Sequence, residues 1–132
     1  MKPKRLPPDD PREWIRRAKS NLAHARAYDP EVDLADNCFD AQQCAEKAIK
    51  SVFVHRRETF PFVHDLKRLI HLLERAGVKI PKYLRQANEL TRYAFVTRYP
   101  GEDSSVTERQ YRRAVRVAAA VLRWAERKIE RP

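Results

Sequence analysis

The sequence predicts an all-α protein: an antiparallel four-helix up-and-down bundle with a fifth, shorter helix. Apolar residues recur at three- and four-residue spacing along most of the 132-residue chain, while no stretch alternates polar and apolar residues as a strand does. Glycine occurs only twice, at Gly77 and Gly101, and both positions suit turns. The length predicts one domain over residues 10–132, and the basic, Pro-rich residues 1–9 are expected to form a disordered tail.

The first predicted helix has a clear beginning and end. Asp10 is a suitable cap, Pro11 fits the first turn, and Glu13 lies where a capping box places its acid. Apolar residues then recur at helical spacing until Asp29 and Pro30 end the helix.

The second predicted helix, from about Asp33 to about His55, is the element around which the others pack. Its apolar face is rich in small residues, which allow a neighbouring helix to come close. We therefore expect it at the centre of the bundle. On its polar side, Glu46 and Lys50 have the spacing and order of an exposed ion pair. The small residues are Ala41, Cys44, Ala45 and Ala48.

Two further helices are predicted next. The third begins at Val63 or His64, where His64 could cap it and Asp65 would complement the helix dipole. It runs to Ala76, and Gly77 ends it as a left-handed cap.

The fourth predicted helix begins at Pro81 and ends near Arg98, before a Pro-Gly turn. Its inward positions are Leu84, Ala87, Leu90 and Ala94.

The last predicted helix, from Thr107 to about Glu130, has the most regular apolar face in the chain. Thr107 and Gln110 form a second predicted capping box. Opposite the apolar face, within an arc of roughly 100°, lies a row of arginines that could follow a phosphate backbone. Because exposed helix faces are commonly charged, we favour a solvated face over a binding surface. The row comprises Arg109, Arg112, Arg113, Arg116, Arg123, Arg127 and Arg131.

The charge predicts polyanionic partners. Twenty-eight Lys and Arg residues against 18 Asp and Glu give a formal net charge of +10, which favours nucleic acid first and an anionic membrane surface second. No apolar run approaches the length of a membrane span and no signal peptide is visible, so we expect a cytoplasmic protein without membrane association.

No metal or cofactor is expected. Cys38 and Cys44 are six residues apart on one helix, about 9 Å along its axis, which is too far for a disulfide and matches no zinc pattern. None of the four histidines has a His or Cys partner at metal-ligand spacing. The chain also lacks a Gly-rich phosphate loop, a serine elbow and a dense carboxylate cluster.

Three segments in order resemble the HEPN family of small all-helical domains. They are residues 41–50 (AQQCAEKAIK), His64-Asp65-Leu66, and Arg98-Tyr99-Pro100 before the final helix. The resemblance covers about Glu13 to Ile129. It implies a bundle that forms a homodimer, with basic grooves at the interface. It also implies pairing with a minimal nucleotidyltransferase, often as a toxin–antitoxin system.

Many HEPN proteins are metal-independent ribonucleases whose site is an Arg followed, after four to six residues, by a His. No histidine follows Arg98, whereas six residues separate Arg57 from His64, earlier in the chain than usual. The leading hypothesis is therefore binding of a nucleotide or RNA rather than cleavage. Its candidate contacts are Arg98, Tyr99 and His64, with Lys47, Lys50 and Arg92 as secondary candidates. The resemblance also makes Tyr99 a candidate acceptor of adenylate from the nucleotidyltransferase.

Two alternatives stay open. In a ribonuclease toxin, His64 would be the acid/base, and Arg57 or Arg98 would hold the phosphate. In a purely structural docking and dimerisation module, a large residue at Ala48 should disrupt assembly.

Overall fold

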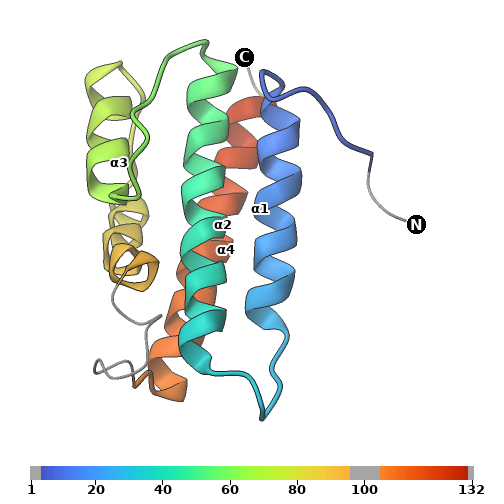
Figure 1. The fold of residues 1–132 in the computed structure, drawn as a ribbon. Coiled ribbons are helices and arrows are strands. Elements are labelled where there is room, and N and C mark those ends of the chain that lie inside the picture. Colours follow the sequence, from blue (N-terminus) through green and yellow to red (C-terminus); the bar gives the residue numbers. More distant parts are fainter. Residues whose placement is uncertain (1–3, 96–104, 131–132) are drawn as a thin grey trace.

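The computed structural model describes residues 4–95 and 105–130, and within them every regular element is helical (Figure 1). The all-helical prediction is therefore confirmed. The elements are α1 (Pro11–Arg26), α2 (Leu34–His55), α3 (Leu66–Arg75), the 3₁₀ helix η1 (Lys82–Ala94) and α4 (Glu108–Glu130).

Helix α2 lies at the centre and contacts each of the other four elements. Its small residues are fully buried, and the Sγ of Cys44 lies 3.9 Å from the carbonyl oxygen of Ala118 on α4. This close approach is what small side chains at a helix interface permit. Ala48 is fully buried within the single chain. A large residue there is therefore expected to disturb the packing of the single chain first and its assembly only as a consequence.

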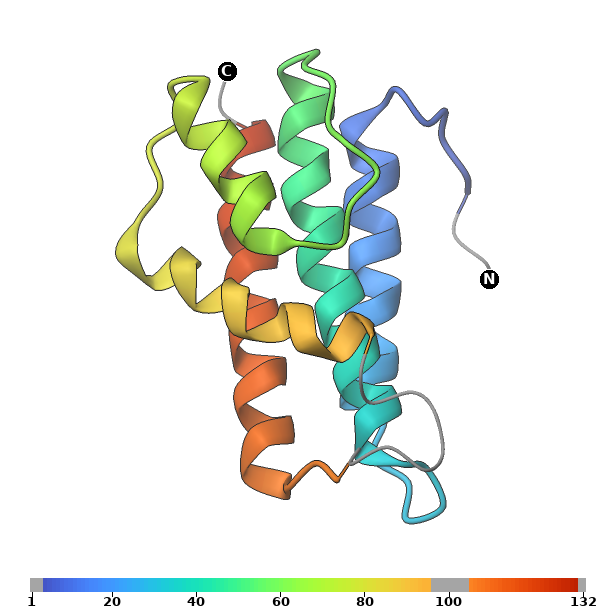
Figure 2. The same ribbon diagram turned by 60° about the vertical axis from the view of Figure 1, so that its left-hand side comes forward.

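The three long helices form the main layer of the bundle. In Figure 1, α1 runs antiparallel to α2 and α4, which rise side by side. After α2 the connector of residues 56–65 returns along α2, so α3 starts part-way down and runs in the direction of α2. Figure 2 shows η1 crossing α4 and α2 below α3. Together α3 and η1 occupy the fourth position of the bundle.

The start of α1 departs from the prediction in one detail. Asp10 caps the helix as predicted, accepting a hydrogen bond from an N–H of the first turn. Glu13 does not complete a capping box, because its carboxylate binds the guanidinium groups of Arg16 and Arg17 at 2.6 and 2.7 Å. It also accepts a hydrogen bond from the N–H of Leu6 at 3.0 Å, so part of the N-terminal segment contacts α1.

Helix α3 begins later than predicted. Asp65 is its cap and accepts a hydrogen bond from the N–H of Arg68 at 3.4 Å, so the helix starts at Leu66. The prediction that His64 could cap α3 is wrong because its side chain turns toward α2 instead. Gly77 ends the helix with φ +96°, the left-handed conformation that was predicted.

The apolar residues of η1 explain its tight winding. Leu84, Ala87, Leu90 and Tyr93 are all buried and are spaced by three. A helix with three residues per turn aligns that spacing on one face. The remainder of the predicted fourth helix, toward Arg98, lies outside the described residues.

The predicted capping box of the last helix is confirmed. The N–H of Thr107 donates to Gln110 Oε1 at 2.9 Å, and the N–H of Gln110 donates to Thr107 Oγ1 at 3.1 Å. Helix α4 then begins at Glu108 and runs for 23 residues.

Candidate functional site

Three polar residues of α2 share one face and are buried where the connector and α3 pack. Gln42, Glu46 and Lys50 are spaced by four, which places them on one side of a helix. Their exposed fractions are 0%, 4% and 6%. Glu46 and Lys50 do pair, with Nζ 2.9 Å from Oε2. The pair is buried, however, which corrects the expectation of an exposed one.

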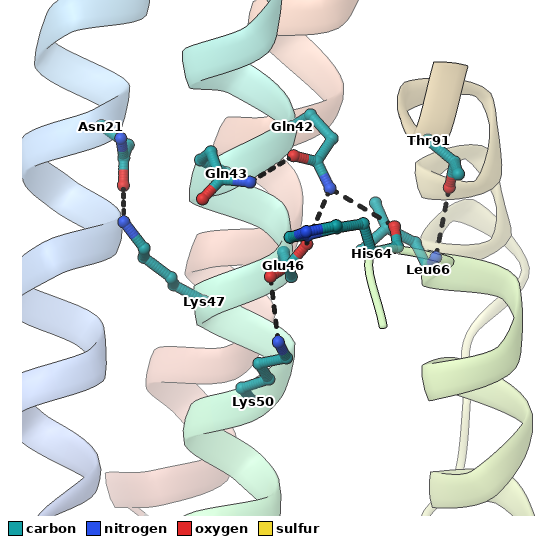
Figure 3. A network of polar contacts seen from close by, with 9 residues as sticks. All are labelled: Asn21, Gln42, Gln43, Glu46, Lys47, Lys50, His64, Leu66 and Thr91. Atoms are coloured by element: carbon teal, nitrogen blue, oxygen red, sulfur yellow. Dashed lines mark hydrogen bonds and ion pairs between the residues drawn. The ribbon is translucent and has the colours of Figure 1, made fainter. Parts of the chain in front are cut away.

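The Glu46 carboxylate is the centre of this network (Figure 3). Its Oε2 pairs with Lys50, and its Oε1 accepts a hydrogen bond from Gln42 Nε2 at 2.9 Å. The same Oε1 lies 2.7 Å from Nδ1 of His64. Burial by itself raises the pKa of Glu46, but the hydrogen bonds from Gln42, His64 and Lys50 together lower the pKa below its ordinary value. The carboxylate is therefore ionised at neutral pH.

His64 reaches the network from the connector and remains half exposed. With Nδ1 facing the carboxylate, a proton on Nδ1 satisfies both partners, and Nε2 takes no part in the network. The ring also meets Phe95 edge-on, with centroids 5.6 Å apart. An imidazole held in this way can exchange a proton at Nε2 or, when protonated, attract a phosphate.

Aromatic packing holds the connector in place. Phe60 packs edge-on against Trp14 and Phe53, with centroids 5.5 and 5.6 Å away, and the Lys50 ammonium lies 5.2 Å from the centre of its ring. Beyond His64, the N–H of Leu66 donates to Thr91 Oγ1 at 3.1 Å and joins the connector to η1. The position of His64 is thus fixed from both sides.

The structure brings together only some of the residues predicted for the site. His64 and Lys50 belong to one network, while Lys47 turns to α1 and donates from Nζ to Asn21 Oδ1 at 2.8 Å (Figure 3). Burial, followed by the charge of Arg17, lowers the pKa of Lys47.

Arg57 and His64 lie at different levels of the bundle. Arg57 follows the C-terminus of α2 in a left-handed conformation, φ +57°. Nine residues of helix, about 13 Å, separate Glu46 from the end of α2.

Arg92 is exposed on η1, and its guanidinium carbon lies 5.2 Å from the centre of the Tyr93 ring. The other two candidates, Arg98 and Tyr99, lie outside the described residues.

Sequence reasoning did not identify the role of Gln42 and Glu46. The available signal was the four-residue spacing of Gln42, Glu46 and Lys50, which aligns three polar side chains along one line of α2. That spacing identifies a polar face, but it cannot show that a histidine 18 residues further on covers the face and buries it.

Among the described residues, no group of His, Cys, Asp and Glu is arranged to hold a metal ion. Over the same part of the chain, no helix is both long and apolar enough to cross a membrane.

Comparison with known proteins identifies relatives over nearly the whole chain. The family model of the HEPN domain matches residues 11–128. TT1696 from Thermus thermophilus, whose crystal structure is known, is 27% identical in sequence to this chain. The two structures match with a TM-score of 0.77 over 91% of this chain and 98% of that chain. ST0689, an archaeal HEPN homologue of known crystal structure, is 25% identical in sequence to this chain. Its structure matches with a TM-score of 0.74 over 96% of this chain and 99% of that chain. No curated protein matches this chain.

Proposed function

Because this chain belongs to the HEPN domain family, we propose that it binds phosphate groups of a nucleotide or RNA on the surface that carries His64. In the same proposal it is one half of a toxin–antitoxin-like pair with a minimal nucleotidyltransferase. The observation that carries the proposal is the 2.7 Å contact between Glu46 and His64. It orients an imidazole toward solvent beside an exposed aromatic ring.

The surroundings of His64 suit a nucleotide. A protonated Nε2 would donate to a phosphate oxygen, and Phe95, which is 52% exposed, offers a ring for stacking on a base. Lys50 lies behind this surface with its charge paired to Glu46, and Lys47 donates to Asn21 on α1; we retain both as secondary contacts. We retain Arg98, Tyr99 and Arg92 as further contacts, and Tyr99 as the acceptor of adenylate, on the strength of the sequence resemblance.

A titration with ATP and with a short single-stranded RNA at low salt tests this function. We expect His64→Ala to weaken binding by roughly tenfold, because it removes one charge-assisted contact. His71, which is exposed on α3, provides the matched control, and His71→Ala should bind as the unmodified protein does. The proposal fails if neither ligand binds at low salt.

A metal-independent ribonuclease is the second candidate, favoured by the same histidine. A carboxylate that orients one imidazole nitrogen while the other faces the substrate is the arrangement of a general acid/base. The phosphate would be held by Arg98, or by Arg57 of a second copy, since Arg57 lies away from His64 in its own chain. Expression should then be toxic, and purified protein should cleave RNA in EDTA unless His64 is replaced by Ala. Harmless expression without cleavage would rule this candidate out.

The proposed homodimer has a candidate interface on the same side. Phe62, in the connector two residues before His64, is 98% exposed, and Phe95 is 52% exposed. Exposed aromatic side chains of this size are characteristic of interfaces. Light scattering on the Phe62→Ser variant tests this interface: the variant should have the mass of a monomer if the connector forms the dimer interface.

If the protein is a docking module only, Arg98→Ala and Tyr99→Phe should change the binding of nucleotide and RNA little.

A further inference from the structure

A basic groove lies along α4 where η1 packs against it. Figure 2 shows the crossing of these two helices. Its volume is roughly 430 Å³, and its polar lining consists of four arginines from α4 with Tyr83 and Gln86 from η1. We call this the arginine groove. The four arginines are Arg113, Arg116, Arg123 and Arg127.

The arginine groove contains unneutralised charge. No carboxylate lines it, and within the described residues Arg116 and Arg123 have no ion pair. Arg127 donates to the Tyr83 hydroxyl at 3.0 Å, which fixes the guanidinium without cancelling its charge. Arg113 alone is paired, through two hydrogen bonds to Glu89 at 2.7 and 2.8 Å.

None of the glutamates of α4 lines the arginine groove. Glu108 pairs with Arg112, and Glu126 pairs with Lys19 of α1. From the sequence, we favoured a solvated face for this arginine row because exposed helix faces are commonly charged. The partners of these glutamates leave the arginine groove cationic, and η1 turns a flat helix face into a concave surface.

We infer that the arginine groove binds the backbone of single-stranded RNA, with Tyr83 stacking on a base. This inference rests on the proposed function and adds a second surface to it. Guanidinium groups match phosphate oxygens with two parallel hydrogen bonds. A cationic groove combined with an exposed aromatic ring is the usual device for single-stranded nucleic acid. Tyr83 supplies that ring, with 42% of its surface exposed.

The length of the arginine groove sets the size of its ligand. Arg113 and Arg127 are fourteen residues apart on α4, about 21 Å along the axis. At about 3.4 Å per stacked nucleotide, this corresponds to about six nucleotides. A mononucleotide would contact one arginine, whereas a hexanucleotide would contact the three arginines that carry no carboxylate partner and would extend toward Arg113. The affinity should therefore rise steeply between a trinucleotide and a hexanucleotide.

Fluorescence anisotropy with a labelled ten-nucleotide RNA tests the inference. The test protein carries Arg116→Ala with Arg123→Ala. The matched control carries Lys67→Ala with Arg68→Ala, which removes the same charge from exposed side chains of α3. We expect roughly tenfold or greater weakening in the arginine groove variant and less than about threefold in the control. The slope of log affinity against log salt should become shallower by about 1.4, since each phosphate contact contributes about 0.7.

Tyr83 distinguishes stacking from charge. Tyr83→Phe should retain most of the RNA affinity, and Tyr83→Ala should lose several-fold. Equal weakening by the arginine groove variant and its control would overturn the inference. It would also be overturned if polyglutamate of matched charge competed as well as RNA does, because the surface would then suit an acidic protein.

Binding of ATP separates this inference from the proposed function. The arginine groove variant should bind ATP with the affinity of the unmodified protein, whereas His64→Ala should bind ATP more weakly. If the arginine groove variant loses RNA while His64→Ala binds both ligands normally, the inference stands and the proposed site at His64 fails.

Discussion

Oε1 of Glu46 lies 2.7 Å from Nδ1 of His64, so the central helix holds a histidine that belongs to a connector. The carboxylate is buried and shared with Lys50 and Gln42, whereas the imidazole is half exposed. This contact links the core to the candidate site, because the Glu46 carboxylate is held by packing in the core and the His64 ring is available to a ligand.

Removing the Glu46 charge should destabilise the protein strongly. Glu46→Gln leaves the buried ammonium of Lys50 without its carboxylate, and breaking one side of a buried pair costs about 3 kcal/mol. Urea unfolding followed by circular dichroism gives the change in the free energy of unfolding. The control is Glu58→Gln, whose partner Arg56 is exposed, and about 1 kcal/mol or less is expected there. Equal losses in the two variants would show that the Glu46 pair contributes no more than a surface pair.

The stability supplied by Glu46 should disappear in acid. Its pKa in the folded protein is below the ordinary value of 4.5, so the unfolded state binds the proton first as the pH falls. The contribution is complete above about pH 4.5 and is lost as the pH falls through the lower, folded pKa. The difference in urea midpoint between the unmodified protein and Glu46→Gln should therefore shrink from about pH 7 to about pH 3. A difference that stays constant would contradict the ionised carboxylate described above.

The two cysteines should be inert in the folded protein. Burial raises the pKa of Cys38 to about 11 and that of Cys44 to about 12. At about pH 8 almost no thiolate is present, and the thiolate is the reactive form. A disulfide reagent should therefore label neither thiol before unfolding and both in denaturant. Ala23→Cys, at an exposed position of α1, should react at once and serves as the positive control. Rapid labelling of the unmodified folded protein would contradict the packing of α2.

Enlarging a small residue of α2 should destabilise the folded chain itself and not only dissociate the proposed dimer. Ala48→Leu inserts three carbons into a fully buried position, which costs about 1–3 kcal/mol or more. Ala23→Leu makes the same change on the exposed face of α1 and should cost little. Thermal unfolding at several protein concentrations separates the cases. A loss for Ala48→Leu that vanishes at high concentration would indicate an effect on assembly instead.

Local signals in the sequence determined most of the helical framework. The three- and four-residue spacing of apolar side chains, the cap at Asp10 and the capping box at Thr107 act within one or two turns. The small residues from Ala41 to Ala48 also identified α2 as the central helix. Each of these features depends on neighbours in the chain, and a single sequence displays them directly.

The site and the arginine groove were decided only by tertiary structure. His64 was predicted either to cap α3 or to contact a ligand, and the structure shows its ring bound to a buried carboxylate 18 residues earlier rather than to the start of α3. The arginine row was predicted as a solvated face, and it is concave only because η1 crosses α4. Electrostatic contacts between distant segments depend on where the backbone brings them, and helical periodicity carries no information about that.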